Sequence, residues 1–296
     1  MIKLGVIGFS DGNGHPYSWG AIFNGYDKEA MSDCGFPVIC DYLSKRELPQ
    51  ECINGAQITH VWTQDKQLSE HIATAALIDN VCETIDELMG AVDAVLLARD
   101  DWQSHRDIGL ALLKSGKPVY IDKPITVYSK ELDVLLQAQT YSGQIFSCSA
   151  LRFSHQLRLT DAEKSGLGDV KYIHAMVPKS WEKYAVHLVD PVVGLFAQND
   201  EIELMKRFAH GEIVQVQAQW GSGLLTQFTT FGSYASKLQI DIVGTKSSKT
   251  IVWDDAFSAF KAALEVFVYQ VKNDIFVDES SHHQKVVSIL EKGMVE

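Results

Sequence analysis

The first sixteen residues, an apolar strand that runs into a glycine-dense loop, constrain the fold more than any other part of the chain. The strand pattern covers Ile2 to Ile7, and the loop Gly8–Pro16 holds three glycines. A helix is predicted from Pro16 toward Tyr26, because proline suits the first helical turn. Glycines let the backbone approach a phosphate, and a helix N-terminus presents unpaired N–H groups to it. The order strand, glycine loop, helix therefore predicts a site for the pyrophosphate of a dinucleotide.

The loop departs from the G-x-G-x-x-G spacing, since Ser10 stands where the second glycine would fall and the loop is lengthened. A tight glycine turn without a ligand is the alternative interpretation. The residues predicted to contact the cofactor here are Gly8, Ser10, Gly12, Asn13 and Gly14.

The first half of the chain alternates strand and helix patterns, which predicts a parallel, doubly wound α/β sheet of six strands. Four of the other five strands are expected at residues 58–63, 92–98, 119–122 and 145–150, and helices at 68–76, 84–89, 104–115 and 130–139. The segment from Met31 to Gly55 has no clear period and is predicted to be irregular.

The second half has a different pattern. Three long strand patterns follow one another at residues 215–220, 224–231 and 238–243, with a helix pattern at 257–272. Successive strands predict an open, largely antiparallel sheet, with helices such as 257–272 beside it. We therefore expect a dinucleotide-binding Rossmann domain over residues 1–150 and a substrate-binding and oligomerisation domain over 151–296.

Composition excludes several other classes. The net charge is −12 and lysine and arginine form no runs, which argues against nucleic acid as a partner. No apolar stretch reaches membrane-spanning length and a structural strand begins at once, so we expect a cytoplasmic protein without a membrane partner. The five cysteines lack a C-x-x-C pair and are expected to be reduced thiols, with no metal site. His282 and His283 lie in a polar stretch that is predicted to be a solvated loop.

The clearest chemical candidate follows the strand Val119–Ile121. There the apolar strand gives way at once to Asp122-Lys123-Pro124, which lies at the carboxyl end of a predicted parallel strand. Open α/β sheets bind their ligands at that edge. Lys123 is therefore a candidate for chemistry, although a lysine that only solvates a loop is the alternative.

Together these motifs resemble the Gfo/Idh/MocA oxidoreductases over nearly the whole chain. The matching elements are Asp122-Lys123-Pro124, His187-Leu188-Val189-Asp190, His105 before Gly116-Lys117-Pro118, and Arg152-Phe153. The resemblance implies an NAD(P)-dependent enzyme that acts on a sugar, a sugar derivative such as a nucleotide-activated sugar, or a cyclitol. It also implies a homodimer or homotetramer formed through the C-terminal sheet.

The resemblance places Lys123 near nicotinamide and substrate and His187 at the hydroxyl that is oxidised. Physical chemistry agrees, because loss of a hydride from a carbinol requires a base for the hydroxyl proton. Lys123 would stabilise the alkoxide-like charge. Asp190 could orient the imidazole of His187, or it could cap a helix whose first position is Pro191.

Departures from the family pattern concern the substrate side. Lys183 stands where family members often carry an aspartate, and it could pair with an anionic substrate group or simply be exposed. Tyr184 beside it could hydrogen-bond the substrate. Arg152 could contact cofactor or substrate, or form a salt bridge across the domain boundary.

The choice of cofactor depends on the end of the second strand, where an acid would select NAD. Thr63 occupies the expected place and Asp65 follows two residues later, with no arginine close by. NAD is therefore favoured, and NADP is not excluded. Trp102 and His105, predicted on the loop after the strand 92–98, could flank the nicotinamide, or they could serve a helix start and surface packing.

Two other functions fit the same motifs. One is a glycosidase that uses tightly held NAD for transient oxidation, and the other is a non-catalytic dinucleotide-binding protein. The segments 31–55 and 181–184 are expected to shape substrate recognition.

Overall fold

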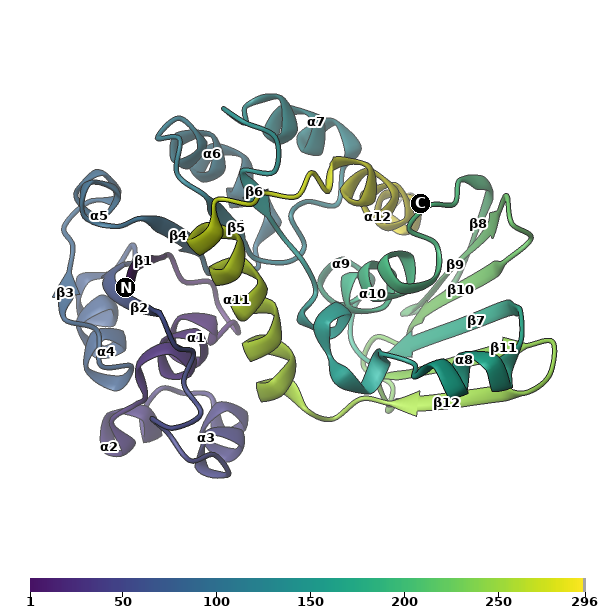
Figure 1. The fold of residues 1–296 in the computed structure, drawn as a ribbon, viewed down its shortest axis with the longest axis horizontal. Helices are drawn as coiled ribbons and strands as arrows, with labels where there is room; N and C mark the ends of the chain where they lie inside the picture. The colour runs from purple at the N-terminus through teal and green to yellow at the C-terminus, as the bar shows by residue number, and fades with distance from the viewer. Residues whose placement is uncertain (295–296) are drawn as a thin grey trace. The chain divides into compact units, whose positions relative to one another are not determined.

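The computed structural model describes residues 1–294, which form two compact units that are discontinuous in sequence. The first unit comprises Met1–Ile125, Val134–Ser147 and Phe260–Asp278. The second comprises Thr126–Asp133, Cys148–Ala259 and the described residues from Glu279 onward. Figure 1 traces this path from the purple N-terminal strand to the yellow C-terminal helix. The chain thus leaves the first unit after Ser147 and later contributes one more helix to it.

The first unit is built on a six-stranded parallel sheet in the order β3-β2-β1-β4-β5-β6. Its strands are β1 (Ile2–Ile7), β2 (Ala56–Trp62), β3 (Asn80–Val81), β4 (Ala94–Leu97), β5 (Val119–Ile121) and β6 (Ile145–Phe146). The strands β4 and β5 are buried throughout, as expected for apolar runs with both faces covered. The predicted doubly wound sheet is confirmed. Its strand order reverses between β1 and β4, and ligands bind outside the carboxyl ends of strands at such a point.

Most helices of this unit lie where the sequence predicts them. They are α1 (His15–Asn24), α4 (Lys66–Ala75), α5 (Ile85–Ala91), α6 (Trp102–Leu113) and α7 (Ser129–Gln137), whose last residues belong to this unit. Thr84 caps the N-terminus of α5, since the Glu87 amide donates to Thr84 Oγ1 at 3.1 Å.

The prediction of an irregular segment from Met31 to Gly55 is wrong in part, because two helices cross it. Helix α2 (Lys28–Ser32) is capped by Asp27, whose carboxylate accepts from the Ala30 amide at 2.9 Å. Helix α3 (Pro37–Ser44) carries its proline in the first turn and buries Ile39 and Leu43, which are four residues apart. A five-residue helix is too short to show a period, and a proline that normally breaks helices here begins one.

Helix α11 (Ala256–Asn273) corrects a second expectation, since from Phe260 onward it belongs to the first unit and not beside the second sheet. The ring of Phe267 lies 5.6 Å from that of Tyr120 on β5 and 5.7 Å from that of Phe146 on β6. Tyr120 in turn lies 5.0 Å from Trp19 of α1. The period of an amphipathic helix reveals its apolar face but does not identify the sheet that the face covers.

The second unit contains a six-stranded sheet in the order β12-β11-β7-β10-β9-β8. Its strands are β7 (Val170–Val177), β8 (Ile202–His210), β9 (Ile213–Trp220), β10 (Leu225–Thr230), β11 (Gln239–Gly244) and β12 (Ser248–Val252). Only β7 and β10 pair in parallel, and the other neighbours are antiparallel. The prediction of a largely antiparallel sheet is therefore confirmed, with β7, β8 and β12 added to the three predicted strands.

Helices cover one face of this sheet. The elements are the 3₁₀ turns η1 (Ala150–Phe153) and η2 (His155–Leu157), and the helices α8 (Asp161–Leu167), α9 (Trp181–Tyr184), α10 (Val186–Phe196) and α12 (Ser280–Met294). Helix α10 packs on β7, and α12 packs on β8 and β9. The strand predicted over residues 145–150 ends early, because Ser149 caps η1 by accepting from the Leu151 amide.

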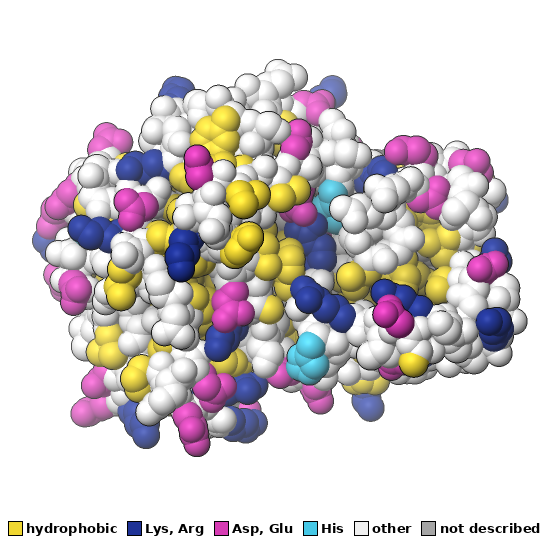
Figure 2. All heavy atoms as spheres, viewed as in Figure 1, with side chains coloured by type: hydrophobic (Ala, Val, Ile, Leu, Met, Phe, Trp, Pro, Cys, Tyr) yellow, Lys and Arg dark blue, Asp and Glu magenta, His cyan; other side chains and the backbone are white. Residues whose placement is uncertain are grey.

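The cysteines are all free thiols, as predicted, and the Sγ atoms of Cys34 and Cys40 lie 3.9 Å apart. Within the described part of the chain, none of the helices is both long and apolar enough to cross a bilayer. On the face drawn in Figure 2, acidic and basic side chains are intermixed.

Replacing Phe267 by alanine should destabilise the first unit by about 3–5 kcal/mol, since it removes a fully buried ring from the aromatic cluster with Tyr120 and Phe146. Tyr269→Ala is the matched control on the same helix, because Tyr269 is 60% exposed and its loss should change stability by less than about 0.5 kcal/mol. Urea unfolding of both variants measures the difference. Equal effects of the two substitutions would contradict this packing.

Candidate active site

The glycine loop connects β1 to α1 with the geometry that a phosphate site needs. Gly8 has φ of +82°, which favours glycine, and its amide donates to the Trp62 carbonyl at 2.8 Å. Helix α1 starts at His15 with Gly14 as its N-cap, with no side-chain cap and no acidic residue in its first turn. Gly12 also has φ of +82°, and a Cβ there would meet open space. The loop and the helix N-terminus therefore fit a pyrophosphate group.

Ser10, which replaces the second glycine of the expected motif, points into the protein. Its Oγ donates to Asp100 Oδ1 at 2.7 Å and accepts from the Asp100 amide at 3.1 Å. This pair joins the glycine loop to the segment that follows β4. Sequence reasoning missed Asp100, although its position directly after a buried strand is a usable signal.

Asp122 at the end of β5 holds the other side of the loop. Its Oδ2 accepts from Asn13 Nδ2 at 2.8 Å and from His15 Nδ1 at 2.6 Å, and its Oδ1 accepts from the Lys123 amide at 2.7 Å. Burial alone would raise the pKa of Asp122, but the charges of His15 and Lys123 and these hydrogen bonds outweigh it and lower the pKa to about 2. His15 is thus a site residue that sequence analysis did not identify.

Lys123 lies beside these groups with 9% of its surface exposed. Its Nζ is 3.7 Å from Asp100 Oδ2, a charge contact longer than a hydrogen bond. Asp100 therefore contacts both Ser10 of the glycine loop and Lys123. The structure brings the loop and the lysine together at the carboxyl ends of β1, β4 and β5.

Trp102 and His105 lie at the start of helix α6, so the prediction that they occupy a loop is wrong and the alternative of a helix start is confirmed. His105 is completely buried, and its ring nitrogens lie 3.1 Å from the Ile125 carbonyl and 2.8 Å from the Arg99 carbonyl. Such contacts support a role in positioning the two segments that carry Asp100 and Lys123, and not direct contact with a nicotinamide.

At the end of β2 the polar side chains are engaged locally. Thr63 Oγ1 donates to the Asp65 carbonyl at 2.6 Å, and Asp65 caps α4 by accepting from the amides of Gln67 and Leu68. Gln64, which sequence analysis did not single out, pairs with both the amide and the carbonyl of Phe9 in the glycine loop. The cap holds the Asp65 carboxylate in a defined position at the start of α4.

The second unit holds His187 on α10. Nδ1 of His187 lies 3.0 Å from Ser149 Oγ, and the ring is 5.4 Å from that of Tyr184. Lys183 is exposed on α9, while Tyr184 is half-buried and accepts a hydrogen bond from Lys179 Nζ, which also lies over its ring. Lys123 and His187 belong to different units, and their action on one substrate stays a prediction.

Asp190 does not cap a helix, so that interpretation is wrong. It lies inside α10 with Pro191 following it, because the helix already begins at Val186. The carboxylate accepts from the Ser149 amide at 3.0 Å and lies 2.7 Å from His282 Nε2. Burial alone would raise the pKa of Asp190, but the charge of Arg152 and the hydrogen bond to His282 hold it below its usual range.

Arg152 forms a buried salt bridge inside the second unit. Its two terminal nitrogens donate to the Glu279 carboxylate at 2.9 Å each, and its Nε is 3.5 Å from Asp190 Oδ2. Arg152 and Glu279 also line a cavity of about 890 Å³ in this unit. The pairing satisfies the two terminal nitrogens within the protein, whereas the buried Nε has only its charge contact with Asp190, and these contacts support a structural role for Arg152.

The prediction of a solvated loop for His282 and His283 is wrong, because both are buried in helix α12. Burial lowers the pKa of His283 to about 4, although Glu279 partly opposes the shift. The sequence around these histidines is polar, but it forms a helix with one buried face. His282 and His283 lie on that face, at positions where apolar residues are usual.

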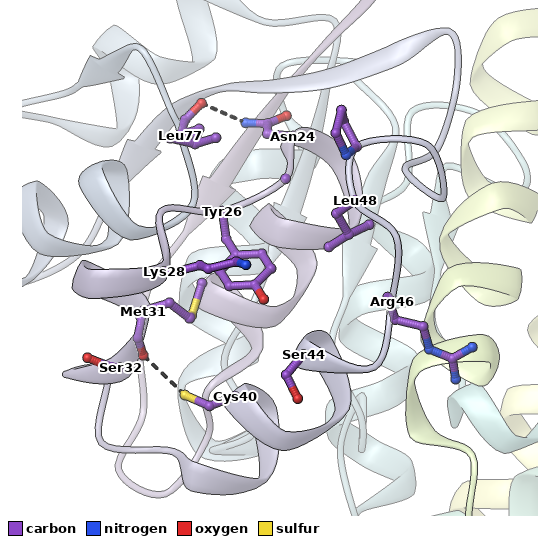
Figure 3. Close-up of a pocket in the computed structure, with 12 residues that line it drawn as sticks. Asn24, Tyr26, Lys28, Met31, Ser32, Cys40, Ser44, Arg46, Leu48 and Leu77 are labelled. Atoms are coloured by element: carbon purple, nitrogen blue, oxygen red, sulfur yellow. Dashed lines mark hydrogen bonds between the residues drawn. The ribbon is translucent and has the colours of Figure 1, made fainter.

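A separate pocket of about 440 Å³ lies in the first unit (Figure 3). It is lined by Asn24 and Gly25 at the C-terminal end of α1 and by residues of α2 and α3, including Met31 and Cys40. The glycine loop is at the other end of α1, about 15 Å away for a helix of ten residues. This pocket is therefore distinct from the candidate cofactor site. Among residues 1–294, His, Cys, Asp and Glu side chains form no group of three or more suited to a metal ion.

A parallel sheet in the order 3-2-1-4-5-6 with a glycine loop after its first strand defines a dinucleotide-binding fold. Residues 35–149 match the Gfo/Idh/MocA family model, which is described as an oxidoreductase family with an NAD-binding Rossmann fold. Over these residues the chain has the Rossmann fold of that family. The resemblance deduced from the motifs is thereby confirmed over residues 35–149, and the description of that family as NAD-binding agrees with the expectation of NAD as cofactor.

Solved structures share the fold over the whole length. The apo scyllo-inositol dehydrogenase from Lactobacillus casei has a TM-score of 0.72 at 14% identity, with 99% of this chain and 95% of that chain covered. The myo-inositol 2-dehydrogenase from Lactobacillus plantarum has a TM-score of 0.73 at 11% identity, with 98% of this chain and 95% of that chain covered. The UDP-N-acetylglucosamine 3-dehydrogenase GnnA from Acidithiobacillus ferrooxidans has a TM-score of 0.69 at 13% identity, with 99% of this chain and 96% of that chain covered. None of the curated proteins matches this chain in sequence.

The buried His283 should make stability depend on pH in the weakly acidic range. Because its pKa falls from 6.5 to about 4 on folding, the unfolded state binds more protons, and stability decreases as pH falls below 6.5. The loss at pH 5 should be about 2 kcal/mol relative to pH 7.5. His283→Phe removes this contribution, so urea unfolding at both pH values should show a smaller loss than in the wild type. The same loss in both proteins would refute the assignment.

Proposed function

We propose that this protein is an NAD(P)-dependent dehydrogenase or reductase that acts on a carbinol or ketone of a sugar, a sugar derivative or a cyclitol. The observation that carries the proposal lies in the first unit, where Asp100 contacts both Ser10 of the glycine loop and Lys123. Cofactor loop and lysine are thereby placed at one edge of a Rossmann sheet. The NAD-binding oxidoreductase family matched by residues 35–149 supports the same activity.

The cofactor would be held by the glycine loop and the N-terminus of α1, with Thr63 and Asp65 near the adenosine ribose. An acid at that position accepts from ribose hydroxyls and disfavours a 2′-phosphate, which makes NAD the proposed cofactor over NADP. When bound, the nicotinamide accepts or supplies the hydride. The chain's own residues must then handle the proton and the charge on the substrate oxygen.

Lys123 and His187 are the residues proposed for that task. The Lys123 ammonium donates a hydrogen bond to the substrate oxygen and stabilises negative charge that develops on it. His187 accepts the hydroxyl proton during oxidation and returns it during reduction. Tyr184, whose ring lies 5.4 Å from that of His187, is proposed as an additional hydrogen-bond partner of the substrate.

Charge and the structural relatives both support a proposal for the substrate class. Lys179 donates to Tyr184 and the exposed Lys183 precedes Tyr184 in the chain, and two such cations suit a substrate that carries a carboxylate or a phosphate. Relatives named for inositols and for UDP-N-acetylglucosamine share the fold. We therefore favour a nucleotide-activated sugar, with an uncharged cyclitol as the alternative that the activity assay separates.

The second sheet is proposed as the interface of a homodimer or homotetramer. Its face opposite the helices presents Leu204, Phe208 and Leu225, which are between 37% and 52% exposed. Exposed apolar side chains on a sheet face are typical of surfaces that pair with another subunit.

Activity should depend on both proposed residues. Lys123→Met and His187→Asn should each lower kcat/KM at least about a hundredfold with NAD and the best substrate of a sugar and cyclitol panel, while NAD binding by calorimetry persists. Lys114→Met is the matched control, an exposed lysine of the first unit. If both residues act on one step, the double variant should lose much less than the product of the single losses.

The same assay separates the alternatives. One NADH formed for each product molecule indicates a dehydrogenase, whereas glycosidic cleavage without net NADH indicates the glycosidase. Absence of any hydride transfer across the panel, with NAD still bound, would favour a non-catalytic protein and contradict the proposal.

Lys183→Ala should raise KM for an anionic substrate roughly tenfold and leave KM for an uncharged cyclitol unchanged, because it removes one charge that faces the anion. Steady-state kinetics with both substrate types measures this selectivity. An unchanged KM for the anionic substrate would discard the assignment of Lys183.

A further inference from the structure

The imidazole of His187 meets a hydroxyl group at the ring nitrogen that faces the protein interior. Nδ1 of His187 lies 3.0 Å from Ser149 Oγ. Ser149 has no exposed surface, and its Oγ also accepts from the Leu151 amide at 3.4 Å as the N-cap of η1. A carboxylate at this place would only accept hydrogen bonds, whereas a hydroxyl both donates and accepts.

Ser149 is held in position by a buried carboxylate. Its amide donates to Asp190 Oδ2 at 3.0 Å, while Asp190 Oδ1 lies 2.7 Å from His282 Nε2. Arg152 Nε is 3.5 Å from the same carboxylate, and Glu279 binds the other end of that guanidinium. The groups that surround Ser149 and His187 therefore come from η1, α10 and α12, and from α9 through Tyr184.

The chemistry of the two partners leaves two arrangements. Leu151 occupies one lone pair of the serine oxygen, so the second lone pair can accept from Nδ1–H of His187, and the neutral ring then has its own lone pair at Nε2, the atom that takes up a proton. Alternatively the serine hydroxyl donates to Nδ1, and Nε2 then carries the proton. The first arrangement is the base needed for oxidation of a hydroxyl group. Once Nε2 has taken up that proton, the imidazolium still donates Nδ1–H to Ser149, and it is the acid needed for reduction of a ketone. In the second arrangement Nε2 has no lone pair for the substrate proton, so Ser149 must accept from Nδ1 for His187 to act.

We propose that Ser149 is a positioning residue that keeps Nδ1 of His187 hydrogen-bonded in both protonation patterns, and that Asp190 fixes Ser149 through its amide. Asp190 thus acts on His187 through the backbone of Ser149. The inference rests on the proposed function for its catalytic meaning, but the pairing of Ser149 with His187 is testable without any substrate.

The direct test is ¹⁵N NMR of the imidazole nitrogens in protein labelled with ¹⁵N-histidine, with His187→Asn used to assign the His187 signals. Ser149→Ala should move both His187 nitrogen signals, because Nδ1 loses its partner and the tautomer ratio changes. Ser149→Cys should do the same, since a thiol is a weak donor and acceptor of similar size. Ser149→Thr keeps the hydroxyl and should preserve the wild-type signals.

Ser154→Ala is the matched control. Ser154 is a buried serine that caps η2 by accepting from the Gln156 amide, just as Ser149 caps η1. It should leave the His187 signals unchanged, so loss of a 3₁₀ cap is separated from loss of the imidazole partner. Unchanged His187 signals in both Ser149→Ala and Ser149→Cys, or equal shifts in Ser154→Ala, would overturn the inference.

Kinetics then connects the pairing to the reaction. Ser149→Ala should lower kcat about tenfold and change the pH profile of kcat, with KM little affected, and Ser149→Thr should restore both. If the NMR signals move but no oxidoreductase activity is found in the wild type, the proposed function fails while the pairing stands. If activity is present and Ser149→Ala changes neither the signals nor the pH profile, the pairing fails while the proposed function stands.

Discussion

The candidate cofactor site depends on one buried carboxylate, that of Asp122. It terminates β5, and through three hydrogen bonds it holds Asn13 of the glycine loop, His15 of α1 and the amide of Lys123. An ionised carboxylate in the protein interior is stable only when such partners compensate for lost hydration. The charges of His15 and Lys123 and these hydrogen bonds outweigh burial and lower the pKa of Asp122 to about 2. Because one carboxylate accepts from all three partners, it links the loop, the helix start and the lysine.

The second unit uses the same device around Asp190. This carboxylate also lies inside the protein and also pairs with a histidine, His282. It accepts a hydrogen bond from the backbone amide of Ser149, the residue whose hydroxyl contacts His187. The difference lies in the cation, which is Arg152 with its own acidic partner Glu279. In each unit a buried aspartate therefore stabilises the backbone beside a functional candidate.

The parallel sheet and its helices follow from sequence because long apolar strands and periodic helices carry strong local signals. Strand β3 has two residues and α2 has five, which is too short for any period. The placement of α11 on the first unit is a tertiary choice, decided by Phe267 meeting Tyr120 and Phe146, and no local pattern encodes it. Composition shows that a helix has an apolar face, but it does not show which sheet that face covers.

The site residues also divide into those that the sequence reveals and those that only the folded structure reveals. Lys123 and the glycine loop could be found because strand ends and glycine spacing are visible in sequence. His15 and Ser149 could not, since each acts through a partner about 40 to 110 positions away. His282 shows what a local pattern misses. This histidine lies in a polar stretch of sequence, but it is buried because its ring pairs with the carboxylate of Asp190, 92 positions away.

The departure at Ser10 illustrates how a binding loop can change its sequence and keep its geometry. A glycine at the second motif position lets the backbone approach a pyrophosphate, and a side chain there would normally obstruct it. Ser10 avoids this because its hydroxyl turns inward to Asp100, which accepts it at 2.7 Å. The same carboxylate then contacts Lys123. The substitution therefore exchanges conformational freedom for a fixed link between the phosphate loop and the lysine, which preorganises the site before any ligand binds.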